Sequence, residues 1–206
     1  MCINFSRIIE SGIMDEVLKI ISNYVEANEE EADALRNILK EKKLKRKEYL
    51  LREGQVCNYA TFISKGCLRY YYLVNGEEST GQFFFENGWY ADYESFLSGE
   101  PSSQNIQALE DCSLYLIYRR DLEALFSRHP VFEKFGRLMA ERAVLGLKKK
   151  NEFLTLQSHE ERYLQLINDR PKVIQRVSLK YIASYLGMKP ESLSRIRKRL
   201  FDKQKS

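Results

Sequence analysis

The residues with the clearest capacity for chemistry lie near the C-terminus, in the segment 190–201. Its outward positions combine a carboxylate, hydroxyls and cations on one side of an amphipathic pattern: Glu191, Ser192, Ser194, Arg195, Lys198 and Arg199. In the major groove of DNA, a carboxylate can accept a hydrogen bond from cytosine N4, an arginine can donate two to guanine O6 and N7, and a serine can serve either strand. We therefore predict that Glu191 and Arg195 contact bases.

A second group of residues around this segment has the character of phosphate contacts, which set the position of a protein on DNA without reading its sequence. These residues are Lys180, Ser192, Arg197, Lys198, Arg199 and Lys203. The alternative is a structural helix pair whose basic face is simply solvated.

The elements that must position these side chains form a predicted helix-turn-helix over 178–200. Apolar residues recur at three- and four-residue spacing in two short runs, as two amphipathic helices with a shared core require: Leu179, Ile182, Leu186, Met188, Leu193, Ile196 and Leu200. Ala183 permits a close crossing, Gly187 permits the turn, and Pro190 suits the first turn of the second helix.

Charge is distributed unevenly along the chain, whose formal net charge is +4. Residues 156–206 carry twelve Lys and Arg against five Asp and Glu, a net +7, whereas residues 1–155 carry 21 against 24, a net −3. A basic segment joined to a near-neutral one is typical of a phosphate-binding module attached to another domain.

Composition places the chain among globular proteins, with 44% hydrophobic and 30% charged residues. The sequence has no apolar run near the ~20 residues needed to span a bilayer, and no secretory signal pattern is visible, so we expect a cytoplasmic location and no membrane partner. Four widely separated cysteines, Cys2, Cys57, Cys67 and Cys112, are expected to be reduced and mostly buried.

An α+β fold follows from the rest of the pattern. Between Leu44 and Tyr118, short alternating runs rich in β-branched and aromatic residues are separated by glycines and Asn-Gly pairs. This predicts an antiparallel, jelly-roll-like β-roll. Flanking helices are expected at 15–26 and from Asn28, which with Glu31 forms a capping-box pattern.

A long helix is predicted over 131–154. Its apolar residues form two stripes, one with Phe132, Met139, Ala143 and Gly146 and the other with Phe135, Leu138 and Leu145. Because the β-roll can cover only one stripe, we expect the other to pack on the same helix of a second subunit, giving a homodimer. A wholly buried helix in a monomer is the alternative.

The predicted domains are an effector or sensor domain at 1–155, which includes the dimerisation helix, and a DNA-binding domain at 156–206. Ser158 and Glu161 form a second capping-box pattern at the start of the latter. The C-terminal domain is expected to be a small winged-helix-type module, with only 173–177 available for a wing strand before the motif.

This order of elements resembles the Crp/Fnr family of bacterial transcription regulators over about residues 15–201. The phrases that carry the resemblance are 62–70, 158–166 and 182–196. The Glu-x-x-Ser-Arg pattern with which the Fnr side of the family reads bases falls on Glu191, Ser194 and Arg195. The resemblance implies a dimer that binds palindromic double-stranded DNA and responds to a small-molecule effector.

The resemblance weakens at the effector pocket, for which the candidate residues are Asp92, Tyr93, Glu94, Ser102 and Ser103. Asp92 or Glu94 could replace the family's ribose-binding acid, but Ser102 and Ser103 stand where its phosphate-binding arginine falls. A cyclic phosphate would lose a bidentate, charge-assisted contact there. We therefore expect the β-roll to sense an effector of unidentified chemistry. The alternative is that the protein responds to a cyclic nucleotide through a divergent pocket.

An enzyme on a jelly-roll barrel is the alternative from another class. Metal-dependent barrels use histidines, and none lies between Leu44 and Tyr118. Phosphate-binding glycine loops and nucleophile-elbow motifs are also missing from the sequence. We predict no catalytic residue, metal or cofactor.

Overall fold

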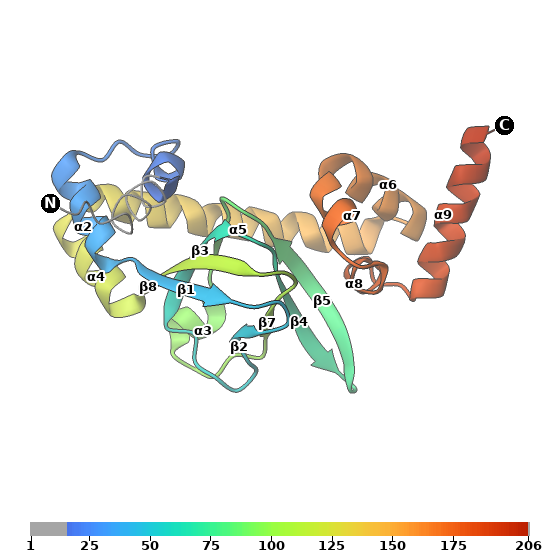
Figure 1. Ribbon diagram of the computed structural model, residues 1–206, viewed down its shortest axis with the longest axis horizontal. Helices are drawn as coiled ribbons and strands as arrows, with labels where there is room; N and C mark the ends of the chain where they lie inside the picture. The colour runs from blue at the N-terminus through green and yellow to red at the C-terminus, as the bar shows by residue number, and fades with distance from the viewer. Residues whose placement is uncertain (1–15, 206) are drawn as a thin grey trace, which may run out of the picture. The chain divides into compact units, whose positions relative to one another are not determined.

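The computed structural model describes residues 16–205 (Figure 1). Residues 16–21 are helical, and the elements that follow are α2 (Glu29–Ile38), β1 (Lys40–Leu44), β2 (Tyr49–Leu51), β3 (Tyr59–Lys65), β4 (Leu68–Val74), β5 (Glu77–Phe84), β6 (Trp89–Tyr90), α3 (Tyr93–Ser98), β7 (Asn105–Ala108), β8 (Cys112–Tyr118), α4 (Arg119–Arg128), α5 (Pro130–Leu156), α6 (His159–Asp169), α7 (Pro171–Arg176), α8 (Leu179–Tyr185) and α9 (Pro190–Lys205). The α+β class and the order of elements predicted from the sequence are confirmed.

Two four-stranded sheets make the predicted β-roll. The first has the strand order β1-β8-β3-β6 and the second the order β2-β7-β4-β5. In the first sheet, β3 pairs antiparallel with β8, with Phe62 opposite Tyr115. Positive φ angles at Asn75 and Gly76 allow the tight turn between β4 and β5 that the Asn-Gly pair predicts.

The core of the first sheet is continuous with the helices that flank the roll. Phe62, Tyr115 and Ile117 from the sheet are buried with Leu35 from α2, and with Leu125 from α4 and Phe132 and Phe135 from α5. Burying such side chains stabilises the fold by about 1.5–3 kcal/mol each. The helices are therefore part of this core.

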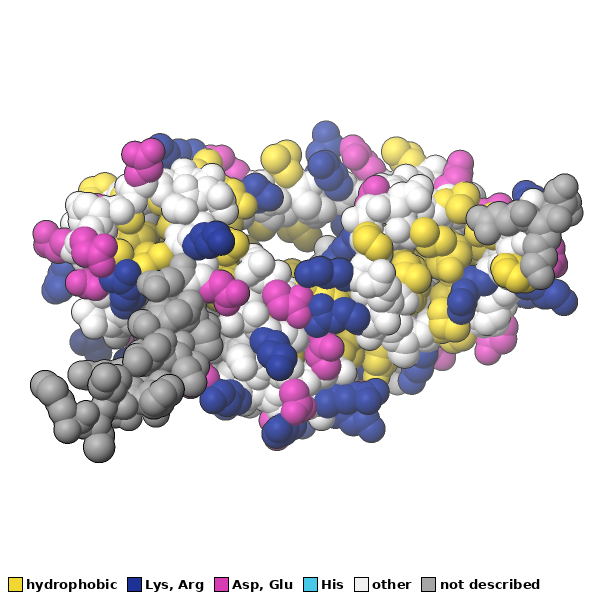
Figure 2. Space-filling model, turned by 45° about the horizontal axis from the view of Figure 1, so that its top comes forward, with side chains coloured by type: hydrophobic (Ala, Val, Ile, Leu, Met, Phe, Trp, Pro, Cys, Tyr) yellow, Lys and Arg dark blue, Asp and Glu magenta, His cyan; other side chains and the backbone are white. Residues whose placement is uncertain are grey.

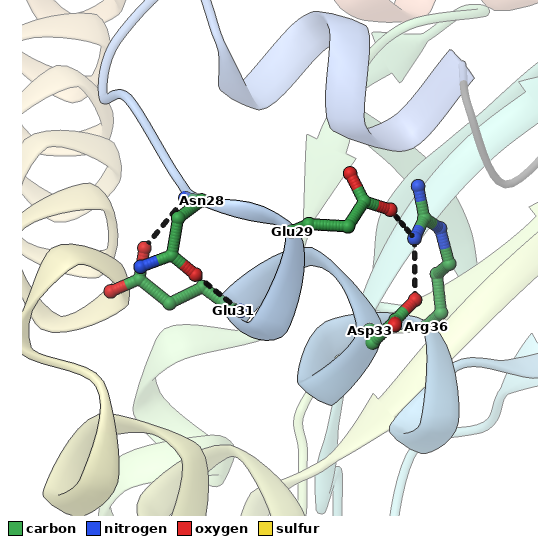
Figure 3. A network of polar contacts seen from close by, with 5 residues as sticks. All are labelled: Asn28, Glu29, Glu31, Asp33 and Arg36. Carbon is green, nitrogen blue, oxygen red and sulfur yellow. Dashed lines mark hydrogen bonds and ion pairs between the residues drawn. The ribbon is translucent and has the colours of Figure 1, made fainter.

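The start of α2 shows how the local sequence fixes a helix end (Figure 3). The Asn28 side chain accepts from the Glu31 amide at 3.0 Å, and the Glu31 carboxylate accepts from the Asn28 amide at 2.8 Å. Further along the helix, Arg36 pairs with Glu29 and Asp33. The capping box predicted from the spacing is confirmed, as is the one formed by Ser158 and Glu161 at α6.

Helix α5 is divided along its length, and this corrects the two lengthwise stripes predicted from the sequence. Phe132 and Phe135 are buried, and Leu138 and Met139 pack against the same core, although the prediction placed them in different stripes. Beyond residue 143, Leu145 and Gly146 are exposed. The earlier half of the helix therefore belongs to the core of the roll.

The chain divides into two compact units. One comprises residues up to Leu68 together with Phe84–Arg142, and the other comprises Arg69–Phe83 together with Ala143 onward. The β4–β5 hairpin is thus grouped with the C-terminal helices. The division into functional domains at 155/156 stays a prediction.

The short segment that the sequence left available for a wing strand is helical. Residues 171–176 form helix α7, and between residues 157 and 205 the regular elements are all helices. Pro171 at the first helical position favours a helix start, and Val173 is fully buried as part of it. The C-terminal module is therefore a helix-turn-helix without a wing in the described chain.

Cys57, Cys67 and Cys112 are buried, reduced thiols, as predicted, whereas Cys2 lies outside the described residues. Burial raises the pKa of the Cys112 thiol to about 11, which keeps it protonated at neutral pH. Across residues 16–205, no helix combines the length and the apolar character that crossing a membrane requires.

Candidate DNA-binding surface

The helix-turn-helix is built around Gly187. Its φ angle of 71° lies in the left-handed region, and a Cβ atom added there would lie 3.3 Å from Nη1 of Arg162. The turn is closed by hydrogen bonds from the Gly187 amide to the Ser184 carbonyl and from the Met188 amide to the Ala183 carbonyl. The left-handed conformation favours glycine here, and any added Cβ would press on the Arg162 side chain.

Most of the residues predicted to form the small core of the motif are buried. Ile182, Ala183 and Leu186 of the first helix and its C-cap are buried, as are Leu193 and Ile196 of the second. Leu179 is 39% exposed, so its predicted place in this core is wrong. It is the first residue of α8, and a first-turn side chain projects beyond the helix pair.

The side chains predicted to contact DNA lie on the outside of this pair. Ser192 is half-buried. The other side chains are exposed, namely Lys180, Glu191, Ser194, Arg195, Arg197, Lys198 and Arg199. Arg195 donates to the Ser192 hydroxyl at 3.3 Å, which orients its guanidinium along the helix. Since α9 begins at Pro190, Glu191 lies in its first turn, where the helix dipole favours a carboxylate.

One shallow depression brings several of these cations together. It is lined by Arg195, Lys198, Arg199, Asp202 and Lys203. Over the face shown in Figure 2, basic side chains are interspersed with acidic ones instead of forming one continuous field. The four cations of this depression therefore form a local basic cluster on α9, and such a cluster can contact DNA phosphates.

Two of these cations already face a carboxylate. Glu160, in the first turn of α6, is hydrogen-bonded to Arg199, and its other oxygen lies 3.9 Å from Nζ of Lys203. A DNA phosphate would have to compete with Glu160 for Arg199. Within residues 16–205, the ion pairs of carboxylates include none with Arg195 or Lys198, so the charge of these two side chains is more readily available.

Arg162 is a residue that the sequence analysis did not single out. Its guanidinium donates to the carbonyl oxygens of Leu154 at 2.7 Å, Gln157 at 3.0 Å and Leu186 at 2.8 Å. It thereby ties the end of α5 and the start of α6 to the turn of the motif. No local spacing signals such a contact, because Leu186 is 24 residues away.

Lys150 was also missed. Its ammonium donates to the Tyr185 carbonyl at 2.9 Å and lies 3.2 Å from the centre of the Tyr185 ring. Burial, followed by repulsion from Arg170 and Arg162, lowers the pKa of Lys150 to about 7. The Lys150 amine thus lies at the C-terminal end of α8, in surroundings that disfavour its charged form.

The predicted effector residues separate into two groups. Asp92 and Ser102 are buried and bonded to each other, with the Ser102 hydroxyl donating to Asp92. Tyr93, Glu94 and Ser103 are exposed instead. The structure therefore brings together two of the five predicted residues.

The Asp92 carboxylate has further partners within the roll. Its second oxygen accepts from Gln104 at 3.4 Å, and the Gln104 side-chain oxygen accepts from the Tyr90 hydroxyl at 2.7 Å. The Ser102 hydroxyl also accepts from the Gln104 amide. This group, which we call the Asp92 network, satisfies its own hydrogen bonds. In the part of the chain that the structure describes, His, Cys, Asp and Glu do not gather in threes as a metal site requires.

Comparison with known proteins agrees with the fold. The family model of the cyclic nucleotide-binding domain matches residues 41–129, which span β1 to the end of α4. FixK2 from Bradyrhizobium japonicum is similar in structure, with a TM-score of 0.72 at 19% identity over 81% of this chain and 86% of that chain. A search of curated protein sequences found no match.

Two further structures share the architecture. The c-di-GMP responsive global regulator CLP of Xanthomonas campestris has a TM-score of 0.69 at 15% identity, over 86% of this chain and 93% of that chain. A proposed transcriptional regulator of the Crp/Fnr family from Eubacterium rectale has a TM-score of 0.66 at 18% identity, over 86% and 85%. Residues 41–129 therefore match the model of the cyclic nucleotide-binding domain, and the chain shares the fold of these two structures, as the resemblance found in the sequence predicted.

Proposed function

We propose that this protein is a homodimeric, sequence-specific DNA-binding transcription regulator of the Crp/Fnr family, with an unidentified effector sensed by its β-roll. One observation carries the proposal: α9 presents Glu191, Ser194 and Arg195 on the outer face of a well-packed helix-turn-helix. Polar groups with this exposure and spacing can reach base edges when α9 lies in the major groove.

The dimer part of the proposal is supported by the exposed half of α5. Ala140, Val144, Leu147, Asn151 and Leu154 follow one another at alternating four- and three-residue steps. Val144 and Leu147 are each 65% exposed, which is unusual for apolar residues in mid-helix. This heptad seam fits a second copy of the same helix, and a polar residue such as Asn151 within a seam fixes its register.

The effector part rests on the Asp92 network. Asp92 and Ser102 occupy the region where relatives would hold a cyclic phosphate, yet each is bonded to the other. A cyclic nucleotide would have to break these bonds without a nearby replacement for them. We therefore propose that the effector is not cyclic AMP bound through the usual phosphate clamp. The second candidate is a cyclic nucleotide bound in a divergent pocket.

The proposed roles on α9 are tested by pairing two substitutions. Arg195→Ala should weaken binding to a selected operator by about 1–3 kcal/mol and relax preference at one base pair, because it removes a bidentate contact with guanine. Lys198→Ala should weaken binding to operator and scrambled DNA alike and reduce the salt slope by about one. Fluorescence anisotropy at several salt concentrations measures both, and equal effects of the two changes on specificity would contradict the assignment.

The proposed dimer is tested on the seam. Val144→Gln with Leu147→Gln should weaken association at least tenfold, because the seam loses its apolar contacts. Lys149→Gln, on the opposite side of the same turn, is the control. Sedimentation equilibrium gives the dissociation constants, and a wild-type monomer at micromolar concentration would overturn the dimer.

A further inference from the structure

The β4–β5 hairpin is hydrogen-bonded to α8, the first helix of the motif, through the hydroxyl group of Ser184. Ser184 Oγ accepts a hydrogen bond from the Thr80 amide at 2.8 Å and donates one to the Glu78 carbonyl at 2.8 Å. The hydroxyl therefore pairs with β5 as both donor and acceptor, at residues two apart, as the backbone of a neighbouring strand does. About 100 residues of sequence separate the partners.

A buried cation makes a second contact between the same elements. The Arg69 side chain, on β4, is fully buried and forms an ion pair with Glu78 at 2.9 Å. Its guanidinium lies 4.2 Å from the centre of the Tyr71 ring and 3.7 Å from that of Tyr181 on α8. Tyr181 precedes Ser184 by three residues and so shares its face of the helix.

The other end of β5 is held as well. Arg170, at the end of α6, donates to the Phe83 carbonyl at 2.7 Å, and the Phe83 ring lies 5.3 Å from the ring of Tyr185. The hairpin therefore holds α8 through residues on both strands. It also forms part of the second sheet of the roll.

This contact leaves the proposed DNA-binding face uncovered. The hairpin contacts Tyr181, Ser184 and Tyr185, whereas Glu191 and Arg195 on α9 are exposed in the same structure. The docked arrangement is thus compatible with DNA binding and does not block it.

We propose that Ser184 is a positioning residue for DNA binding: the β4–β5 hairpin holds α8 through its hydroxyl and so fixes the orientation of the motif on operator DNA. This inference rests on the proposed function. In a dimer, both motifs must meet successive major grooves at a fixed separation, so a motif released from the hairpin loses operator affinity before it loses general affinity for DNA.

The test compares Ser184→Thr with Ser184→Val, which have the same shape and differ in the hydroxyl. Ser184→Thr should bind operator within about twofold of wild type, and Ser184→Val about fivefold more weakly, which is the ratio expected for a lost hydrogen bond. Affinity for scrambled DNA should stay equal. Ser127→Ala, which removes a hydroxyl bonded only to the Glu123 carbonyl, is the control for general stability.

Two further readouts separate positioning from simple stability. The Thr80 amide should exchange with deuterium faster in Ser184→Val than in Ser184→Thr, and Ser184→Val should tolerate altered half-site spacing better than wild type. If Ser184→Val fails to fold, the pair Tyr181→Phe and Tyr181→Leu replaces it, since phenylalanine keeps the ring over Arg69 and leucine does not.

The outcomes distinguish this inference from the function on which it rests. Wild-type protein without any operator preference would overturn the proposed function and this inference with it. Wild-type preference together with equal operator affinity and spacing preference in Ser184→Thr and Ser184→Val would overturn the positioning role alone.

Discussion

Two polar regions of the molecule use similar side chains in opposite ways. On α9, Glu191 and Arg195 are exposed, and the one side-chain hydrogen bond that Arg195 makes in the described chain, to Ser192, lies at the surface. In the Asp92 network, a carboxylate and a serine hydroxyl are buried and bonded to each other. The difference teaches that residue type alone does not mark a binding site: what matters is whether the protein itself already uses the hydrogen bonds.

The largest effect is expected on stability, when the buried carboxylate of Asp92 is removed. Asp92→Ala should lower the free energy of unfolding by about 2–3 kcal/mol, because the Ser102 hydroxyl and the Gln104 amide lose a buried acceptor. Glu94→Ala, its exposed neighbour, should change stability by less than about 0.5 kcal/mol. Urea denaturation measures both, and an Asp92→Ala protein as stable as Glu94→Ala would contradict a structural role for the network.

Lys150, a half-buried lysine that donates its hydrogen bond to a carbonyl oxygen, sharpens the comparison next. Because the pKa of Lys150 is about 7 when folded and near 10.5 when unfolded, the unfolded chain binds more protons between these values. Its contribution to stability should therefore rise with pH from about 7 to 10, by on the order of 1 kcal/mol per pH unit. Lys150→Met should flatten this rise, measured by urea titrations at each pH, and an unchanged slope would contradict the buried site.

A smaller effect is expected at Arg199, which is exposed on α9 but already bonded to the Glu160 carboxylate. Glu160→Gln should strengthen DNA binding by about 0.3–1 kcal/mol, since it releases Arg199 from its carboxylate. Glu141→Gln, which removes the carboxylate paired with Arg137 on α5, is the matched control. Anisotropy with operator and scrambled DNA measures the change, and equal affinity in all three proteins would place Arg199 away from the phosphates.

The helix-turn-helix could be predicted from the sequence because its signals are local. Gly187, Pro190 and the three- and four-residue apolar spacing lie within a few turns of one another, and the capping boxes at Asn28 and Ser158 each join two residues that are three positions apart. The β-roll was predictable from alternating runs and turn residues. These patterns report on backbone conformation and burial within one element.

The errors and omissions have a common physical origin in contacts between distant residues. Residues 173–177 were the only room left for a wing strand before the motif, but Pro171 and the buried Val173 make most of this segment a helix. Arg162, Arg69 and Ser184 gain their roles from partners 24 to 112 residues away, which no spacing rule covers. Whether Asp92 and Ser102 would face a ligand or each other likewise depended on the packing of the roll.

The central claim is that the exposed face of α9 reads DNA in a two-fold arrangement. Sequence selection from a random duplex pool with the purified full chain tests this most directly. We expect enrichment of an inverted repeat with half-sites about 34 Å apart, or roughly 10 base pairs from centre to centre, and loss of one base preference in each half with Arg195→Ala. A pool that stays random, or a single asymmetric motif unaffected by Arg195→Ala, would contradict it.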